Sequence, residues 1–340
     1  MHSSWLERLP GAERYYRYYL PLMPLAIEML DLSEFDILLS FSYAVAHGVV
    51  PRPNQLHLSY IYTPLRYTWR RDDRPRAELG YGSGIKGWLF QRLMACFRLW
   101  GRASARRVDR FMAVSACVQQ RVWQAYRRPA QVVYPPVDLD RFQAAARREP
   151  FYVAISRLVP HKQVRIIVES FARLGLPLLV IGDGPQSGNL AKLAGPHTKL
   201  LGWQPDEVVA DLLGRARALV HAAEEDFGIA LVEAQAAGCP VIAYAGGGAS
   251  EIIEEGQTGF FFREQTVESL TAAVEKFERG SRPLSTAMLR SSASRFSKAR
   301  FKESFYQVVE RAWWEAGLPA QKAASPAPAL PAPEAANIRH

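Results

Sequence analysis

The sequence has few cysteines and no long apolar run, and these shortages exclude several classes of protein. Its three cysteines are spread over 340 residues without a C-x-x-C pair, so neither a zinc site nor a disulfide framework is indicated. No apolar run reaches the roughly 18 residues of a membrane-spanning helix, and residues 1–10 lack the apolar core of a signal peptide. We therefore expect a protein of the reducing cytoplasm, soluble or peripheral to a membrane.

Acidic residues are outnumbered in the first part of the chain. The net charge is +9, and residues 1–150 carry all of it, mostly between Arg66 and Arg110. A one-sided basic region indicates an anionic partner: nucleic acid, anionic lipid or a phosphorylated substrate, although a solvated basic helix would give the same pattern. Because no nucleic-acid recognition module accompanies the charge, we expect no nucleic acid, but a peripheral contact with the anionic inner face of the plasma membrane.

From Tyr152 onward, short apolar runs alternate with helical stretches. Near-continuous apolar strands that alternate with helices predict a parallel sheet covered on both faces, a doubly wound domain. The predicted strands are 152–156, 176–181, 216–221, 240–244 and 259–262, and the predicted helices are 162–174 and 228–237.

The first part of the chain is less regular. Its predicted strands are 35–40, 57–62, 111–114 and 131–134, and its predicted helices are 20–32 and a long basic helix over 86–107. We divide the chain into an N-terminal domain (1–147), a second domain (148–285), C-terminal helices that pack back toward the first domain (286–316) and an Ala/Pro-rich disordered tail (317–340).

An acidic segment, Glu224–Gly228, stands between a strand that ends near Ala222 and a helix that begins near Gly228. This placement puts Glu225 on a loop and Glu233 on the helix, at the edge where open α/β sheets bind ligands. The free amides of 227–229 could hold a phosphate, and the carboxylates could accept hydrogen bonds from sugar hydroxyls. A solvated acidic loop with one surface glutamate is the alternative interpretation.

Cations and glycines follow other strands of the same predicted sheet. Arg157 and Lys162 surround one strand-to-helix turn, where they could neutralise a diphosphate or serve as ordinary surface charge. Gly182 closes another strand. Gly247 lies in a triple-glycine turn that allows either close backbone approach or simple flexibility.

Together, these segments resemble the donor-binding domain of glycosyltransferase family 4, whose members are retaining enzymes of the GT-B fold. Glu225 and Glu233 match the E-x7-E motif, Phe227-Gly228 follows the first glutamate as in the family, and Arg157 and Lys162 match its basic pair. The run 233–244 is similar as well. Segments 20–24, 36–48, 62–69 and 134–138 resemble a mannosyltransferase-like branch of bacterial surface-polysaccharide assembly.

The resemblance implies two Rossmann-like, doubly wound domains that face a cleft, and catalysis without a cofactor or a metal ion. Asp138-Leu139-Asp140 has the spacing of a D-x-D metal motif, but its place after two prolines favours a turn. Relatives begin with a strand and a glycine-rich loop, which nothing before Trp5 supplies. We therefore expect an N-terminally truncated chain with an incomplete first domain.

The resemblance also assigns roles to individual residues. Arg157 and Lys162 would contact the donor diphosphate, and Glu225 would bind the transferred sugar; these three are the expected catalytic residues. The expected donor-binding residues are Glu233 on the ribose, the amides of Phe227, Gly228 and Ile229, and the glycines Gly182 and Gly247. The expected acceptor-side residues are Tyr62, Thr63, Arg66 and His47.

Two acceptor-side positions depart from the family pattern. Tyr62 stands where the family usually has a histidine, and tyrosine is a poorer proton acceptor at neutral pH. His47 stands where many relatives carry lysine. We expect a retaining hexosyltransferase that moves mannose from GDP-mannose to a lipid-linked or glycan acceptor. An inactive pseudoenzyme that only binds nucleotide-sugar is the alternative, and the E-x7-E match argues against a third hypothesis, a GT-B epimerase.

Overall fold

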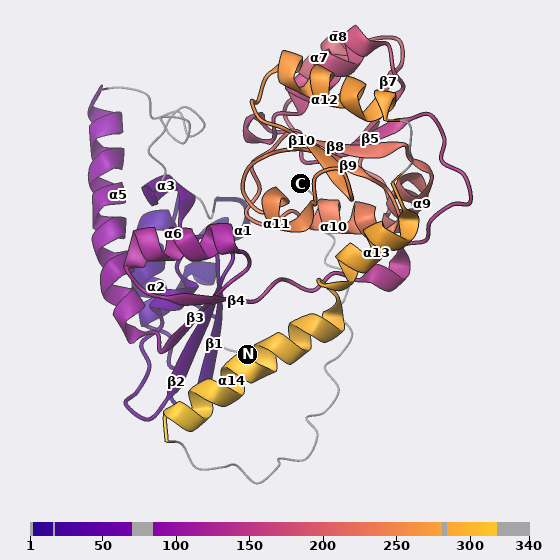
Figure 1. The fold of residues 1–340 in the computed structure, drawn as a ribbon. Coiled ribbons are helices and arrows are strands. Elements are labelled where there is room, and N and C mark those ends of the chain that lie inside the picture. Colours follow the sequence, from indigo (N-terminus) through magenta and orange to yellow (C-terminus); the bar gives the residue numbers. More distant parts are fainter. Residues whose placement is uncertain (1–2, 16–17, 70–83, 281–283, 318–340) are drawn as a thin grey trace.

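The computed structural model describes residues 3–15, 18–69, 84–280 and 284–317, apart from the side chains of Glu13, Arg66 and Tyr67. The chain forms two α/β halves side by side, each built on its own parallel sheet (Figure 1). Most of the predicted disordered tail, 318–340, lies outside the described residues. None of the described helices combines the length and the apolar character needed to cross a membrane.

The N-terminal half contains a four-stranded parallel sheet in the described part of the chain, with the order β1-β2-β3-β4. Its strands are β1 (Ile37–Ser42), β2 (Leu56–Ile61), β3 (Arg110–Ala113) and β4 (Ala130–Val132). Its helices are η1 (Trp5–Arg8), α1 (Ala12–Tyr15), η2 (Leu20–Leu22), α2 (Met23–Glu28), η3 (Ala46–Gly48), α3 (Arg66–Trp69), α5 (Gly84–Ser104), η4 (Ala105–Arg107) and α6 (Ala116–Tyr126).

The C-terminal half contains a six-stranded parallel sheet with the order β10-β9-β8-β5-β6-β7. Its strands are β5 (Tyr152–Ile155), β6 (Leu178–Ile181), β7 (Thr198–Gly202), β8 (Ala218–His221), β9 (Val241–Tyr244) and β10 (Gly259–Phe262). Its helices are η6 (Pro160–Lys162), α7 (Val164–Leu174), α8 (Ser187–Leu193), α9 (Asp206–Arg215), α10 (Ile229–Ala236), α11 (Ala249–Ile252) and α12 (Val267–Arg279). Figure 1 shows α7, α8 and α12 above this sheet and α9, α10 and α11 below it, so both faces are covered.

Two segments connect the halves, the linker after β4 and the C-terminal helix α14. The chain leaves β4, passes through the short helix η5 (Leu139–Arg141) and enters β5. Asp138 is the residue before η5, at the position where a turn was predicted. The predicted C-terminal helices are α13 (Thr286–Ser294) and α14 (Lys298–Glu315). Helix α14 packs on the N-terminal half, as expected for residues 286–316, whereas α13 packs on α10 of the C-terminal half, which corrects that expectation for α13.

Helix α14 covers part of the N-terminal sheet with aromatic side chains. The ring of Phe305 stacks on Phe41 of β1 at 6.2 Å, and Phe301 meets Tyr60 of β2 edge-on at 6.0 Å. The backbone amide of Val137 donates to the carbonyl of Phe296 just before this helix. Buried side chains therefore form one continuous cluster from β2 and β3 through Phe296 to α10, and the halves share a core.

Candidate active site

The strand order of the C-terminal sheet reverses between β5 and β8. The chain adds β6 and β7 on one side of β5, then returns to place β8, β9 and β10 on the other side. Segments that follow neighbouring strands at such a reversal diverge, and open α/β sheets bind ligands there, beyond the carboxyl ends of the strands. We call residues 156–163 after β5 and 222–228 after β8 the switch-point loops.

An ion pair joins the two switch-point loops. The Nζ atom of Lys162 lies 2.5 Å from Oε1 of Glu225, and the two side chains are only 19% and 18% exposed. His221, the last residue of β8, places its Nε2 atom 3.4 Å from the same oxygen. Burial would raise the pKa of Glu225, but His221 and the Lys162 charge outweigh it and hold that pKa below its usual range. Glu225 is therefore a charged hydrogen-bond acceptor at neutral pH.

Two glycines allow other backbone segments to approach the switch-point loops closely. Gly247 has a φ of 62°, and a Cβ atom there would lie 2.0 Å from the carbonyl oxygen of Glu225. Gly182 has a φ of 126°, and a Cβ atom there would lie 2.0 Å from the carbonyl oxygen of Ser156. Both glycines thus set the backbone position of a switch-point loop, so Gly247 is more than a flexible turn residue.

Arg157 shares a loop with Lys162 but lies in a different environment. Its side chain is exposed and has no carboxylate partner among the described residues. An unpaired guanidinium on a loop is available to a phosphate or carboxylate of a ligand. The Lys162 ammonium has three donors, so it can hold Glu225 and still donate to a phosphate.

The start of α10 presents free backbone donors beside Glu225. Gly228 caps the helix with a φ of 108°, and Ile229 follows with a side chain that is 49% exposed. Within the described residues, the amides of 227–229 donate to no acceptor. Because these amides lie at the positive end of the α10 helix dipole, they suit an anionic group.

The aromatic ring of Phe227 has a packing role. It is 5% exposed and lies 5.3 Å from the ring of Phe296 and 5.9 Å from that of Tyr134. Phe227 therefore anchors its switch-point loop in the core shared by the two halves, while its amide remains available.

Glu233 lies on α10 and is partly buried. Burial raises its pKa; the charge of Arg141 opposes this shift and that of Asp206 adds to it. Arg141 and Asp206 themselves form an ion pair at 2.8 Å. Within the described part of the chain, the side chain of Glu233 makes no hydrogen bond, so its carboxylate is available to a ligand hydroxyl.

Helix α6 of the N-terminal half touches the acidic switch-point loop. The Arg121 guanidinium forms ion pairs with Glu224, at 2.7 Å, and with Asp226. Ser115, the N-cap of α6, donates from Oγ to the carbonyl of Asp226 at 2.5 Å. The two carboxylates that flank Glu225 are thus held from the opposite half, and this turns the Glu225 loop toward the N-terminal half.

The first turn of α6 also binds a carboxylate of the C-terminal half. The amides of Ala116 and Cys117 donate to Glu251 at 2.8 and 3.2 Å, and the Tyr134 hydroxyl donates to it at 3.1 Å. Sequence reasoning missed Glu251, as it missed His221, Ser115 and Arg121. The Ser-Ala-Cys start of an apolar helix could have indicated the cap at Ser115, but no local pattern indicates a partner so distant in sequence.

The acceptor-side residues do not form one group. Tyr62 follows β2, is 43% exposed and packs edge-on against Tyr60. Thr63 is buried, and its hydroxyl donates to the carbonyl of Pro64 at 3.3 Å. Arg66 begins α3, and its side chain lies outside the described residues. Tyr62 is therefore the member of the set whose side chain the structure shows at the surface.

His47 is a core residue. Its side chain is 1% exposed and lies between the rings of Trp100 and Tyr126, at 5.4 and 5.0 Å. Burial, with further contributions from His57 and Arg107, lowers its pKa to about 3. Because its side chain is buried, His47 cannot contact an acceptor in this structure, and this corrects the expectation that it is an acceptor-side residue. Among the described residues, no group of three or more His, Cys, Asp or Glu side chains could hold a metal ion.

Residues 137–296, which hold both switch-point loops, match the family model "Glycosyl transferases group 1". The chain is 32% identical over 197 residues to the "GDP-mannose-dependent alpha-(1-6)-phosphatidylinositol monomannoside mannosyltransferase" of Mycobacterium tuberculosis. The matched region covers 47% of this chain and 50% of that protein. It is 29% identical over 186 residues to the "D-inositol 3-phosphate glycosyltransferase" of Mycobacterium avium, covering 48% and 44%. The chain spans about half the length of these curated relatives.

Solved structures resemble the chain over most of its length. A sucrose-phosphate synthase from Thermosynechococcus elongatus has a TM-score of 0.68 at 16% identity, over 90% of this chain and 81% of that chain. The lipopolysaccharide outer core galactosyltransferase WaaB has a TM-score of 0.60 at 15% identity, over 92% and 87%. Such identities show the fold alone. The chain has the two-domain GT-B glycosyltransferase fold, and its residues 137–296 match the glycosyl transferases group 1 domain.

Proposed function

We propose that this chain is a retaining hexosyltransferase of glycosyltransferase family 4, which moves mannose from GDP-mannose to a lipid-linked or glycan acceptor. The Lys162–Glu225 ion pair at the switch point carries the proposal. A cation and a sugar-binding carboxylate are brought together there from two separate strand ends. This is the combination that a nucleotide-sugar requires.

The positions of the charges suggest how the donor would be held. Arg157 and Lys162 would neutralise charge that develops on the diphosphate leaving group as the glycosidic bond breaks. The amides of 227–229 would add hydrogen bonds, Glu225 would accept from hydroxyls of the transferred sugar, and Glu233 would accept from the ribose. Because side chains and amides supply the positive charge, we propose that no metal ion or other cofactor is needed.

The names of the relatives support the donor and the acceptor. One is named for GDP-mannose and a phosphatidylinositol mannoside, and another for inositol 3-phosphate. A phosphate-bearing acceptor also suits the basic N-terminal half. We propose that the protein acts in the cytoplasm at the inner face of the plasma membrane, where a lipid-linked acceptor would be reached.

The proposal is tested by nucleotide release. The purified protein is incubated with GDP-, UDP- and ADP-sugars, with and without membrane lipid extract, and with EDTA. We expect acceptor-dependent GDP release from GDP-mannose, no effect of EDTA, and an α-linked product by NMR. If no sugar nucleotide is turned over under any condition, the transferase proposal is rejected.

Tyr62 favours a second candidate function. It occupies the surface position after β2 where the family usually has a histidine, and a phenol accepts protons poorly at neutral pH. The chain would then be a nucleotide-sugar binder without transfer activity. Calorimetry distinguishes the two functions: GDP-mannose binding that is lost in Lys162→Ala, without turnover in the wild type, supports the binder.

A further inference from the structure

Helix α5 presents an unusual outer face to solvent. In Figure 1 it runs along the side of the N-terminal half that faces away from the C-terminal half. The inner face buries Phe90, Met94 and Phe97. On the outer face, large apolar side chains remain exposed: Ile85 (85%), Trp88 (57%), Leu89 (62%) and Leu99 (70%). A surface helix normally turns polar residues to this side.

Arginines continue the same face. Positions 85, 88, 92, 95, 99, 102 and 106 recur at alternating steps of three and four, so they follow one stripe of the helix and its extension in η4. Arg92 lies over the ring of Trp88, 5.2 Å from its centroid. The segment 84–107 contains six Lys and Arg residues and no Asp or Glu. Apolar side chains and cations are therefore interleaved, without a carboxylate on the helix to neutralise them.

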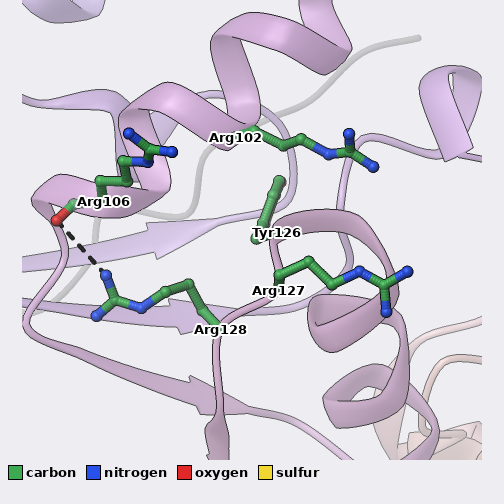
Figure 2. A pocket seen from close by; sticks show the side chains of 5 residues that line it. All are labelled: Arg102, Arg106, Tyr126, Arg127 and Arg128. Carbon is green, nitrogen blue, oxygen red and sulfur yellow. Dashed lines mark hydrogen bonds between the residues drawn. The ribbon is translucent and has the colours of Figure 1, made fainter.

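The stripe ends in a cavity of about 480 Å³ lined by Arg102, Arg106, Tyr126, Arg127 and Arg128 (Figure 2). Arg128 donates to the carbonyls of Ala105 and Val108 at 3.2 and 2.6 Å, which fixes one wall. In the described part of the chain, Arg106 and Arg127 have no ion-pair or hydrogen-bond partner for their guanidinium groups. Four guanidinium groups without a carboxylate are a site for phosphate.

We propose that the outer face of α5 and this arginine cavity form one docking surface for an anionic lipid bilayer. Trp88, Leu89 and Leu99 enter the interfacial region, and the cavity receives the phosphate of a lipid headgroup. Basic helices that expose Trp and Leu lie in the membrane interface in this manner. A second copy of the chain fits less well, because pairing two such faces would bring arginines together without carboxylates. The inference rests on the proposed membrane location but not on the transfer reaction.

Vesicle sedimentation tests the surface. The full chain is mixed with phosphatidylcholine vesicles, with or without phosphatidylglycerol. We expect binding only to the anionic vesicles. Combined Arg102→Gln, Arg106→Gln and Arg127→Gln should weaken it by roughly 100-fold, because each cation near the membrane surface contributes about fivefold. Trp88→Ser with Leu99→Ser should reduce it as well.

Matched controls lie elsewhere on the surface. Arg263→Gln with Arg290→Gln and Arg311→Gln makes the same change in net charge, and Trp203→Ser removes a tryptophan that is even more exposed than Trp88. These variants should bind as the wild type does, and thermal unfolding checks that all variants fold.

Equal losses in the controls, equal binding to neutral vesicles, or saturation of the cavity by soluble glycerol phosphate without vesicle binding would each overturn the proposal. So would a dimer that Trp88→Ser dissociates. GDP release with a soluble acceptor should be unchanged in every variant, which separates this test from that of the transferase function.

Discussion

The two halves of the molecule use polar residues in opposite ways. In the C-terminal half, Lys162, His221 and Glu225 gather at a reversal of strand order, where a ligand can reach them. In the N-terminal half the described strands follow in sequence order, and several polar side chains are buried in the core, where they hydrogen-bond to one another. The Oγ atom of Ser40, for example, lies 2.9 Å from Nε2 of His57, and both residues are buried.

This difference shows that strand order decides where chemistry can occur. Both sheets are parallel, and both place polar residues near strand ends. Only a reversal separates the following loops enough to admit a ligand between them. The N-terminal half therefore contributes through its surface: Arg121 and Ser115 hold the acidic loop, and α5 carries the exposed stripe.

The largest effect is expected when the switch-point ion pair is broken. Lys162→Ala should lower kcat/KM for the donor by roughly 100- to 1000-fold, because it removes a charge that stabilises the leaving group. Steady-state GDP release measures the change. Lys199→Ala removes an exposed lysine of β7 in the same sheet and should have little effect. If both variants behave alike, the switch point is not the active site.

A smaller effect is expected from the close approach at Gly247. Gly247→Ala adds a Cβ atom against the carbonyl of Glu225, whereas Gly175→Ala has a similar φ of 67° but nothing within 4 Å. The backbone strain alone costs about 1–2 kcal/mol, so Gly175→Ala should lose only that much stability. Gly247→Ala should lose several kcal/mol in urea unfolding and should also bind the donor more weakly. Equal losses would contradict the close approach.

Acid should lower the stability of the folded protein, because the N-terminal half contains two buried histidines. Burial lowers the pKa of His47 to about 3 and that of His57 to about 4. Below pH 6.5 the unfolded chain binds protons that the folded chain excludes, so stability falls as the pH decreases from 6.5 toward these values. The loss at pH 5 is roughly 2 kcal/mol for each histidine.

Thermal unfolding between pH 7.5 and 5 measures this loss. His47→Phe removes one of the two titrating groups, so its stability should depend less on pH. The exposed His197 provides the control, since His197→Gln should leave the pH dependence unchanged. A pH dependence that is the same in all three proteins would show that the burial of His47 does not contribute to it.

The smallest effect concerns the contact between the halves. Arg121 is 30% exposed where it pairs with Glu224, and partly exposed ion pairs contribute at most about 1 kcal/mol. Arg121→Ala should therefore raise the donor KM by about two- to fivefold with little change in kcat. Arg165→Ala breaks an ion pair within α7 and should not change KM. If Arg121→Ala leaves KM unchanged, the N-terminal half does not position the acidic loop.

Much of the fold could be predicted from periodicity alone. The predicted strand at 259–262 has the same bounds as β10, and α5 begins and ends within three residues of its prediction. Strand β7 was not predicted, because it is a partly buried edge strand that contains Lys199, and its apolar signal is weak.

The candidate site could be predicted in part. The spacing of Glu225 and Glu233, and the cations after another strand, identified the loops that the fold brings together at Lys162. His221, Arg121 and Glu251 could not be found, because their partners are distant in sequence. His47 was misplaced, since a histidine beside a strand looks the same in sequence whether it faces a ligand or the core.

By itself, the sequence determined the elements and the residue types at their ends, because hydrophobic periodicity and turn residues act locally. It also placed the positive charge in the first half. The tertiary structure decided which loops meet, which polar groups are buried and which face of α5 is left exposed. These properties depend on strand order and on contacts between segments far apart in the chain, and no local pattern contains them.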